Sequence, residues 1–141
     1  MSNDWSLGID SMHRKFKVKE WLVNATDEQK NELLKLRMRM LTEEFAETMN
    51  AYLQGDAEEM IDGLIDTCVI AIGTLNISGV NAGSAWDSVL RANTSKHIGV
   101  KPGRPNPNGL PDLIKPEGWQ GPDHSRNHGE LERIFNAYRN D

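Results

Sequence analysis

The fold is decided by the stretch LTEEFAETMNAYLQGDAEEMIDGLIDTCVIAIG, residues 41–73. Apolar and charged residues recur in it at helical spacing, and no glycine or proline interrupts the chain before Gly55. Gly55 and Asp56 then mark a turn, and helical spacing resumes after them. The stretch therefore predicts two helices joined by a short turn, with the second running back beside the first.

Acidic residues recur on one face of each predicted helix. Residues three or four apart share a helix face, and this spacing selects Glu44 and Glu47 in the first helix and Glu59, Asp62 and Asp66 in the second. Two carboxylate rows that face each other across a helix pair can chelate a hard divalent cation such as Mg²⁺. The alternative is that these acids are solvated helix faces, which is the commoner fate of a single acidic residue.

The neighbours of the second acidic row favour the metal hypothesis. Asp62 and Asp66 lie beside Leu64, Ile65 and Val69, which have the pattern of core residues. A carboxylate that borders a core needs a partner, because a buried unpaired charge is costly. Few basic residues occur between positions 40 and 90, so a metal ion is the natural partner.

Helical patterns also dominate outside the decisive stretch. Thr26 is the expected N-cap of the first acidic helix, whereas residues 99–127 hold all six prolines and form a long Pro/Gly-rich loop. No run reads as a convincing strand. We therefore predict an all-α bundle of about four to five helices in a single domain, residues 1–141, with a C-terminal helix in 128–141. The expected helices cover residues 7–22, 26–53, 57–77, 84–95 and 128–138.

Composition excludes several classes of protein. The formal net charge of −5 argues against a nucleic-acid-binding protein. No stretch approaches 18 consecutive apolar residues, so no membrane span is expected. The single Cys68 cannot form an intramolecular disulfide, and the N-terminus lacks a secretion signal, so we expect a cytoplasmic protein. The apolar run CVIAIGTLNI, residues 68–77, suggests a contact between subunits.

Three motifs together resemble one family. The order Glu-Glu-x-x-Glu, a turn and then Glu-x-x-Asp resembles the all-α nucleoside triphosphate pyrophosphohydrolases. That group includes MazG, the dimeric dUTPases, the dCTP pyrophosphatases and phosphoribosyl-ATP pyrophosphatase. Residues 86–96, WDSVLRANTSK, resemble the family's helix that ends in Asn-x-x-Lys, and residues 115–123, KPEGWQGPD, resemble a tail of small phage-type MazG-like proteins. Residues 12–16, MHRKF, resemble the first helix of those proteins.

The resemblance assigns roles to the acids. It implies Mg²⁺ as the cofactor, with Mn²⁺ as a substitute, in an active site between helix pairs. The implied ligands are Glu44, Glu47, Glu59 and Asp62, while Glu43 or Glu47 would orient or deprotonate the attacking water. One feature departs from the family pattern, because the apolar run follows Asp66 instead of Asp62. The second-helix pair is therefore either Glu59 with Asp62 or Asp62 with Asp66.

The resemblance also implies residues that bind substrate. Lys96 would neutralise β- or γ-phosphate charge, and Asn93 would hydrogen-bond phosphate or sugar. The Pro/Gly-rich loop itself suggests two more residues: Lys115 would close over the triphosphate, and Trp119, which has fewer core reasons to lie in such a loop than on a helix, would stack on the base. Helical spacing places Arg39 four residues before Glu43 on the same face, so Arg39 would either pair with Glu43 or reach phosphate.

The implied reaction is hydrolysis at the α-phosphorus, which gives a nucleoside monophosphate and pyrophosphate. The family suggests a homodimer or tetramer. The phage-type tail suggests control of the deoxynucleotide pool during viral replication in the host cytoplasm, with dGTP first among purine substrates, as in a MazZ-like subgroup. Two alternatives stay open: a non-enzymatic acidic helical interaction protein, and an enzyme that acts on phosphoribosyl-ATP.

Overall fold

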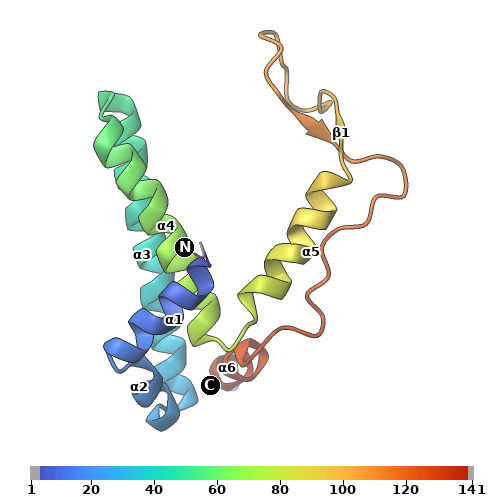
Figure 1. Ribbon diagram of the computed structural model, residues 1–141. Coiled ribbons are helices and arrows are strands. Elements are labelled where there is room, and N and C mark those ends of the chain that lie inside the picture. The colour runs from blue at the N-terminus through green and yellow to red at the C-terminus, as the bar shows by residue number, and fades with distance from the viewer. Residues whose placement is uncertain (1–3, 140–141) are drawn as a thin grey trace. The chain divides into compact units, whose positions relative to one another are not determined.

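The computed structural model describes residues 4–139, except for the side chain of Tyr138, and within them the protein is all-α apart from one short hairpin, as predicted. The last two residues of the expected C-terminal segment, 128–141, lie outside the described residues. Figure 1 shows the order of the elements. The helices are α1 (Trp5–Lys15), α2 (Val18–Asn24), α3 (Asp27–Gln54), α4 (Ala57–Ile77), α5 (Ala82–Thr94) and α6 (Leu131–Arg139), and the strands are β1 (His97–Ile98) and β2 (Leu113–Ile114).

The chain divides into two compact units. The first contains the residues up to Ala82 and those from His128 onward, and the second contains Gly83–Asn127. A single domain over residues 1–141 remains a prediction, and each unit is described by itself below.

Local signals set the ends of α3. The hydroxyl of Thr26 accepts a hydrogen bond from the backbone N–H of Gln29, whose side chain in turn accepts one from the N–H of Thr26. This capping box satisfies two amide groups that would otherwise lack partners at the helix start. At the other end Gly55 adopts a left-handed conformation, φ 69°, which glycine tolerates best. The predicted N-cap and turn are thus confirmed.

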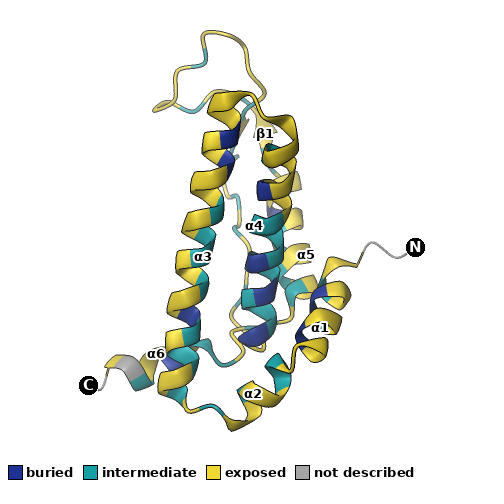
Figure 2. Cartoon of the chain, turned by 90° about the vertical axis from the view of Figure 1, so that its left-hand side faces the viewer, coloured by how far each residue is buried: buried dark blue, intermediate teal, exposed yellow. Residues whose placement is uncertain are grey.

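Helix α4 begins where the turn ends and packs against α3. Asp56 caps it by accepting a hydrogen bond from the N–H of Glu59. The two helices approach each other closely at Gly63, where an added Cβ would overlap the hydroxyl oxygen of Thr48. Figure 2 shows buried positions on both helices among wider exposed surface.

A small apolar core closes one end of this helix pair. Leu34 of α3, Ile77 of α4 and Ile134 of α6 are buried together. The backbone N–H of Glu130 donates to the carbonyl of Ser78, which brings the start of α6 against the end of α4. Helix α6 thereby packs against the N-terminal part of α3.

The prediction of one helix over residues 7–22 is wrong, because α1 and α2 are separate helices. Lys17 between them has φ 61°, a left-handed conformation that interrupts helical hydrogen bonding. The break lets α1 pack on α4 while α2 turns away from the direction of α1. No glycine or proline announces this break in the sequence.

A polar network joins α1 to α3 and α4. His13 is buried, with 2% of its surface exposed, and its Nδ1 lies 2.7 Å from Oδ1 of Asn76. Asn76 also donates to Asp10 at 3.1 Å. Hydrogen bonds from Lys19, Arg14 and Asn76 hold the pKa of Asp10 well below its usual range.

Arg37 of α3 reaches the same network, with a guanidinium nitrogen 3.4 Å from Nε2 of His13. Burial lowers the pKa of this guanidinium. Gly73 leaves room for both side chains, because a Cβ there would lie 3.0 Å from Arg37 and 3.4 Å from His13. Polar contacts therefore fix the position of α1, alongside the buried apolar side chain of Ile9.

Much of the apolar surface of the helix pair remains exposed. By length and composition alone α4 is apolar enough to cross a membrane, a property shared by core helices of water-soluble bundles, and 28% of its most apolar window is buried. Asp62 and Asp66 lie within α4, and charges are costly in a bilayer. The exposed large apolar residues of the pair include Phe45, Met49, Tyr52, Leu53, Ile61, Leu64 and Ile65.

The second unit is built on α5. Strands β1 and β2 pair in antiparallel register, His97 with Ile114 and Ile98 with Leu113. The expectation of no strand was therefore wrong, because two-residue strands are too short to show an alternating pattern. After the hairpin the chain runs back along α5, where the hydroxyl of Ser88 accepts from the N–H of Asp123 at 2.8 Å.

Candidate functional site

The acidic rows of α3 and α4 converge around Glu44. This residue is half-buried, and burial raises the pKa of its carboxyl above the ordinary value. Neighbouring negative charges raise it further because they disfavour a second charge nearby. Those neighbours are, in decreasing order of effect, Asp66, Glu47, Asp62 and Glu43.

These acids have no basic partner within the described part of the chain. Between residues 4 and 139 no lysine, arginine or histidine forms an ion pair with Glu43, Glu44, Glu47, Glu59, Asp62 or Asp66. No ion pair with a described residue therefore compensates the charges of the cluster. A divalent cation fits such a surplus of carboxylate oxygens, which are the ligands that Mg²⁺ prefers.

The carboxylates are gathered but not closed into a coordination shell. Over residues 4–139 no three His, Cys, Asp or Glu side chains lie close enough together to hold a metal ion as they stand. Glu43, Glu47 and Asp62 are exposed, so their side chains are free to change rotamer. The cluster is therefore a set of available ligands that would have to turn inward to bind a metal.

Glu59 lies closer to the turn between α3 and α4 than Asp62 and Asp66 do. Together with Glu47 it lines a hollow of about 150 Å³ near the turn between α3 and α4. Asp62 and Asp66 act on Glu44, whereas Glu59 is absent from the charges that shift the Glu44 pKa. Glu47 belongs to both groups and so connects Glu59 to the other acids. The remaining lining residues of the hollow are Asn50, Ala51, Gln54 and Asp56.

Thr48 and Gly63 position this acidic cluster, and sequence reasoning missed them. Thr48 donates a hydrogen bond of 2.7 Å to the carbonyl oxygen of Glu44, one turn earlier in α3. Gly63 directly follows Asp62 in α4 and lies against Thr48. The available signal was a glycine inside an otherwise helical pattern, which often marks a close approach of two backbones.

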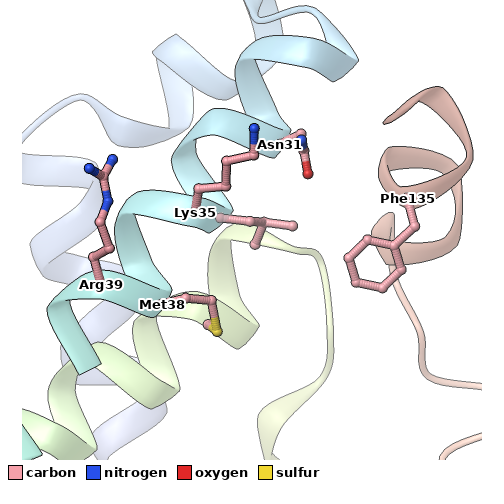
Figure 3. Close-up of a pocket in the computed structure, with 6 residues that line it drawn as sticks. Asn31, Lys35, Met38, Arg39 and Phe135 are labelled. Carbon is pink, nitrogen blue, oxygen red and sulfur yellow. The ribbon is translucent and has the colours of Figure 1, made fainter. Parts of the chain in front are cut away.

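Arg39 lies in a separate hollow and forms no ion pair with Glu43 within the described residues. This hollow of about 580 Å³ lies between α3 and α6. Figure 3 shows Phe135 of α6 facing α3, and the side chain of Arg39 extending away from Phe135. The other lining residues are Asn31, Leu34, Lys35 and Met38. The structure therefore favours neither of the two roles expected for Arg39.

The other expected substrate residues lie in the second unit. Lys96 and Lys115 both place their ammonium groups over the ring of Trp119, at 5.4 and 4.8 Å from its centroid. The indole Nε1 donates a 2.8 Å hydrogen bond to the carbonyl of Ala92. Asn93 is exposed at the end of α5, and its carbonyl accepts from the N–H of Lys96. The unit thus brings two of the expected phosphate-binding residues together on the expected base stacker.

Comparison with known proteins gives one family. The sequence model of the family described as phosphoribosyl-ATP pyrophosphohydrolase (PRA-PH) matches residues 11–93, which is more than half of the chain. The match covers α3 and α4 entirely, with all six acids of the cluster. A search of curated proteins found no match.

Proposed function

Because this chain belongs to the phosphoribosyl-ATP pyrophosphohydrolase family, whose members are all-helical and related to the MazG-like pyrophosphohydrolases, we propose that it hydrolyses nucleoside triphosphates to monophosphate and pyrophosphate. The observation that carries this proposal is the acidic cluster around Glu44. Four neighbouring carboxylates there raise the pKa of Glu44, and none of these acids has a basic partner among the described residues. A solvated helix face has no need for such convergence.

The acids of α3 and α4 would hold Mg²⁺, or Mn²⁺ in its place, through Glu44, Glu47, Asp62 and Asp66, with Glu59 at the level of Glu47. The cation would screen phosphate charge and increase the acidity of a bound water. Glu43 or Glu47 would orient that water, or accept its proton, as it attacks the α-phosphorus. The proton moves to the carboxylate, and pyrophosphate leaves with the bonding electrons of the cleaved P–O bond.

In this proposal Glu44 is a metal ligand, and its raised pKa is the feature that a bound cation would change. Its raised pKa means that it releases its proton less readily than an ordinary glutamate. Binding a cation reverses this effect, because the positive charge favours the ionised carboxyl. Glu43 and Glu47 are exposed and can reach a water on the outer side of the cluster.

We propose a homo-oligomer, a dimer or a tetramer, that covers the exposed apolar face of α3 and α4. Exposed apolar surface often marks a site of association, and a second copy of the same helix pair would offer apolar side chains of the same kind. Sedimentation equilibrium of the full chain tests this assembly. A monomer at micromolar concentration would contradict it.

For the substrate we propose a purine deoxynucleoside triphosphate, with dGTP first, in a role that shapes the cytoplasmic nucleotide pool. This proposal rests on the resemblance of residues 115–123 to phage-type tails. Phosphoribosyl-ATP is the second candidate, because the family match carries that substrate's name. The extra phosphoribosyl group of that substrate calls for additional basic contacts, which the acidic composition of the chain does not favour.

The deciding experiment incubates the protein with Mg²⁺ and each canonical ribo- and deoxynucleoside triphosphate, and with phosphoribosyl-ATP, and separates the products by chromatography. We expect a monophosphate and pyrophosphate, with dGTP consumed fastest. Turnover of phosphoribosyl-ATP alone would replace the proposed substrate by the second candidate. No turnover of any compound over a full metal titration would refute the enzyme and leave the interaction protein.

A further inference from the structure

The hollow between α3 and α6 has no part in the proposed reaction. Its volume of about 580 Å³ lies within the range of small-molecule sites. None of its lining residues is acidic, and none belongs to α4. It is therefore separate from the acidic cluster of α3 and α4.

Contacts within the first unit fix both walls of this hollow. Ile134 of α6 is 2% exposed and packs with Leu34 of α3, which also lines the hollow. Lys30 of α3 forms an ion pair of 3.3 Å with Glu130, directly before α6. Phe135 follows the buried Ile134 and faces α3 with 45% of its surface exposed (Figure 3). Its ring is therefore positioned to stack on a planar ligand without a movement of either helix.

Two polar side chains of α3 line the hollow without a partner. The side chains of Asn31 and Arg39 form no hydrogen bond or ion pair with a residue in the described part of the chain. The amide of Asn31 both donates and accepts, a pattern that matches the edge of a nucleobase. The guanidinium of Arg39 matches the oxygens of a phosphate group.

The spacing of these groups sets the length of a ligand. Asn31 and Arg39 are eight residues apart in α3, which is about 12 Å along the helix axis. Figure 3 shows Arg39 on the opposite side of the hollow from Phe135. Leu34 and Met38 supply apolar surface to the same hollow. A ligand that satisfies all of these groups has a planar ring at one end and an anionic group at the other.

The charges of the hollow limit the anionic group to a small one. Lys35, the other cation of the lining, already pairs with Glu32 at 2.7 Å, which leaves the guanidinium of Arg39. Without a carboxylate the lining offers no ligand of the kind that Mg²⁺ prefers. A triphosphate with its bound metal is therefore a poor match, whereas a single phosphate is a good one.

We infer that this hollow is a second nucleotide site, which binds a nucleoside monophosphate without metal. The base stacks on Phe135 and is hydrogen-bonded by Asn31, and the phosphate is bound by Arg39. This phosphate is distinct from the triphosphate of the proposed reaction. The inference goes beyond the proposed function and does not rest on it, although that reaction would supply such a ligand as its product.

The test is an NMR titration of the full chain, isotope-labelled at its methionine methyl groups, with deoxyguanosine monophosphate in EDTA. Met38 lines the hollow, whereas Met49 and Met60 lie beside the acidic cluster in the sequence of α3 and α4. We expect the methyl resonance of Met38 to shift and those of Met49 and Met60 to stay. M38L assigns the resonance. A shift of Met49 or Met60 without one of Met38 would overturn the inference.

Variants of the hollow test the role of each side chain by calorimetric titration. F135L, N31A and R39Q should each weaken binding by about tenfold or more, the effect of losing one stacking, hydrogen-bonding or charge-assisted contact. F45L is the matched control, because Phe45 is an exposed phenylalanine of α3 outside the hollow. K96Q removes a cation expected to bind the triphosphate, and both F45L and K96Q should bind as the wild type does.

Two fragments separate the ends of the ligand. Deoxyguanosine has the base without the phosphate, and deoxyribose phosphate has the phosphate without the base, so each should bind at least about tenfold more weakly than the whole nucleotide. Unchanged affinity in both N31A and R39Q refutes the site, whether or not F135L folds. Loss of binding in K96Q but not in R39Q would also refute it, because the nucleotide would then occupy the triphosphate site.

Failure of this inference and failure of the proposed function are distinguishable. A protein that hydrolyses dGTP but shows no shift of Met38 retains the function and loses the second site. A protein that shifts Met38 with the monophosphate but hydrolyses no triphosphate retains the second site and loses the enzyme.

Discussion

Gly63 of α4 lies so close to Thr48 of α3 that a Cβ on Gly63 would overlap the threonine hydroxyl oxygen. The contact sets the separation of the two helices beside Asp62 and one turn from Glu44. Close-packed interiors respond to the addition of even one methyl group. The spacing of the acidic rows therefore depends on the absence of a side chain at one position.

The variant G63A should be less stable than the wild type by about 1–3 kcal/mol, the usual cost of overpacking. G8A is the matched control, because Gly8 lies in α1 with nothing within 4 Å of an added Cβ, and alanine there should stabilise the helix. Urea unfolding monitored by circular dichroism measures both. The double variant T48A/G63A should recover most of the loss. Equal stability of G63A and G8A would show that the two helices separate at no cost.

Glu47 is predicted to be indispensable for catalysis but not for folding. E47Q removes a charge that serves both the Glu44 group and the hollow shared with Glu59. We expect its Mg²⁺ affinity and its hydrolysis rate to fall by at least about tenfold, with an unchanged helical signal. E58Q, an exposed acid in the first turn of α4, should keep the wild-type rate. Full activity in E47Q would remove Glu47 from the ligand set.

The raised pKa of Glu44 predicts how stability depends on pH in the absence of metal. The folded protein holds this proton more tightly than the unfolded chain, whose glutamate has the ordinary value of 4.5. The free energy of unfolding therefore falls as the pH rises from that value through the folded-state pKa, and the loss is complete above it. E44Q lacks the charge, so in EDTA it should be more stable than the wild type at neutral pH.

Urea unfolding of both proteins at a series of pH values measures this difference, which should disappear as the pH falls towards 4.5. Saturating Mg²⁺ at neutral pH should stabilise the wild type more than E44Q, because only the wild type keeps the full set of acids. E28Q, at the start of α3 and outside the acidic cluster, should gain no stability in EDTA. A wild type that remains more stable than E44Q in EDTA would contradict the electrostatic origin of the shift.

The contact of Asn76 with His13 predicts that truncating the Asn76 side chain lowers the stability of the protein. N76A removes the partner of the buried Nδ1 of His13 and one donor to Asp10. A buried polar group left without a partner costs about 1–3 kcal/mol, so the melting temperature should fall. N24A is the control, because Asn24 is exposed and donates only to the carbonyl of Glu20 within its own helix. Similar melting temperatures for N76A and N24A would mean that water replaces the lost contact.

The fold class and the two long helices were predictable from the sequence. The boundaries of α3 and α4 depend on Thr26, Gly55 and Asp56, which act on amide groups three or four residues away. The acidic rows follow from helical spacing in the same way. Each of these features depends on residues that are close together in the sequence, so the sequence alone predicts it.

Contacts between distant residues were not predictable. The burial of His13 depends on Asn76, which lies 63 residues further along the chain. The break at Lys17 follows from where α1 finds its partners on α4, and no residue type marks it.

The sequence by itself determined that two helices carry acids at a spacing suited to a cation, because helix geometry is a property of consecutive residues. Only the tertiary structure decided that Gly63 packs against Thr48 and that Asp66 raises the pKa of Glu44. It also decided that the ammonium groups of Lys96 and Lys115 both lie over the ring of Trp119. The physical reason is that packing and electrostatic interaction depend on distance in space. Residues far apart in the chain come within interaction distance of each other only when the helices pack.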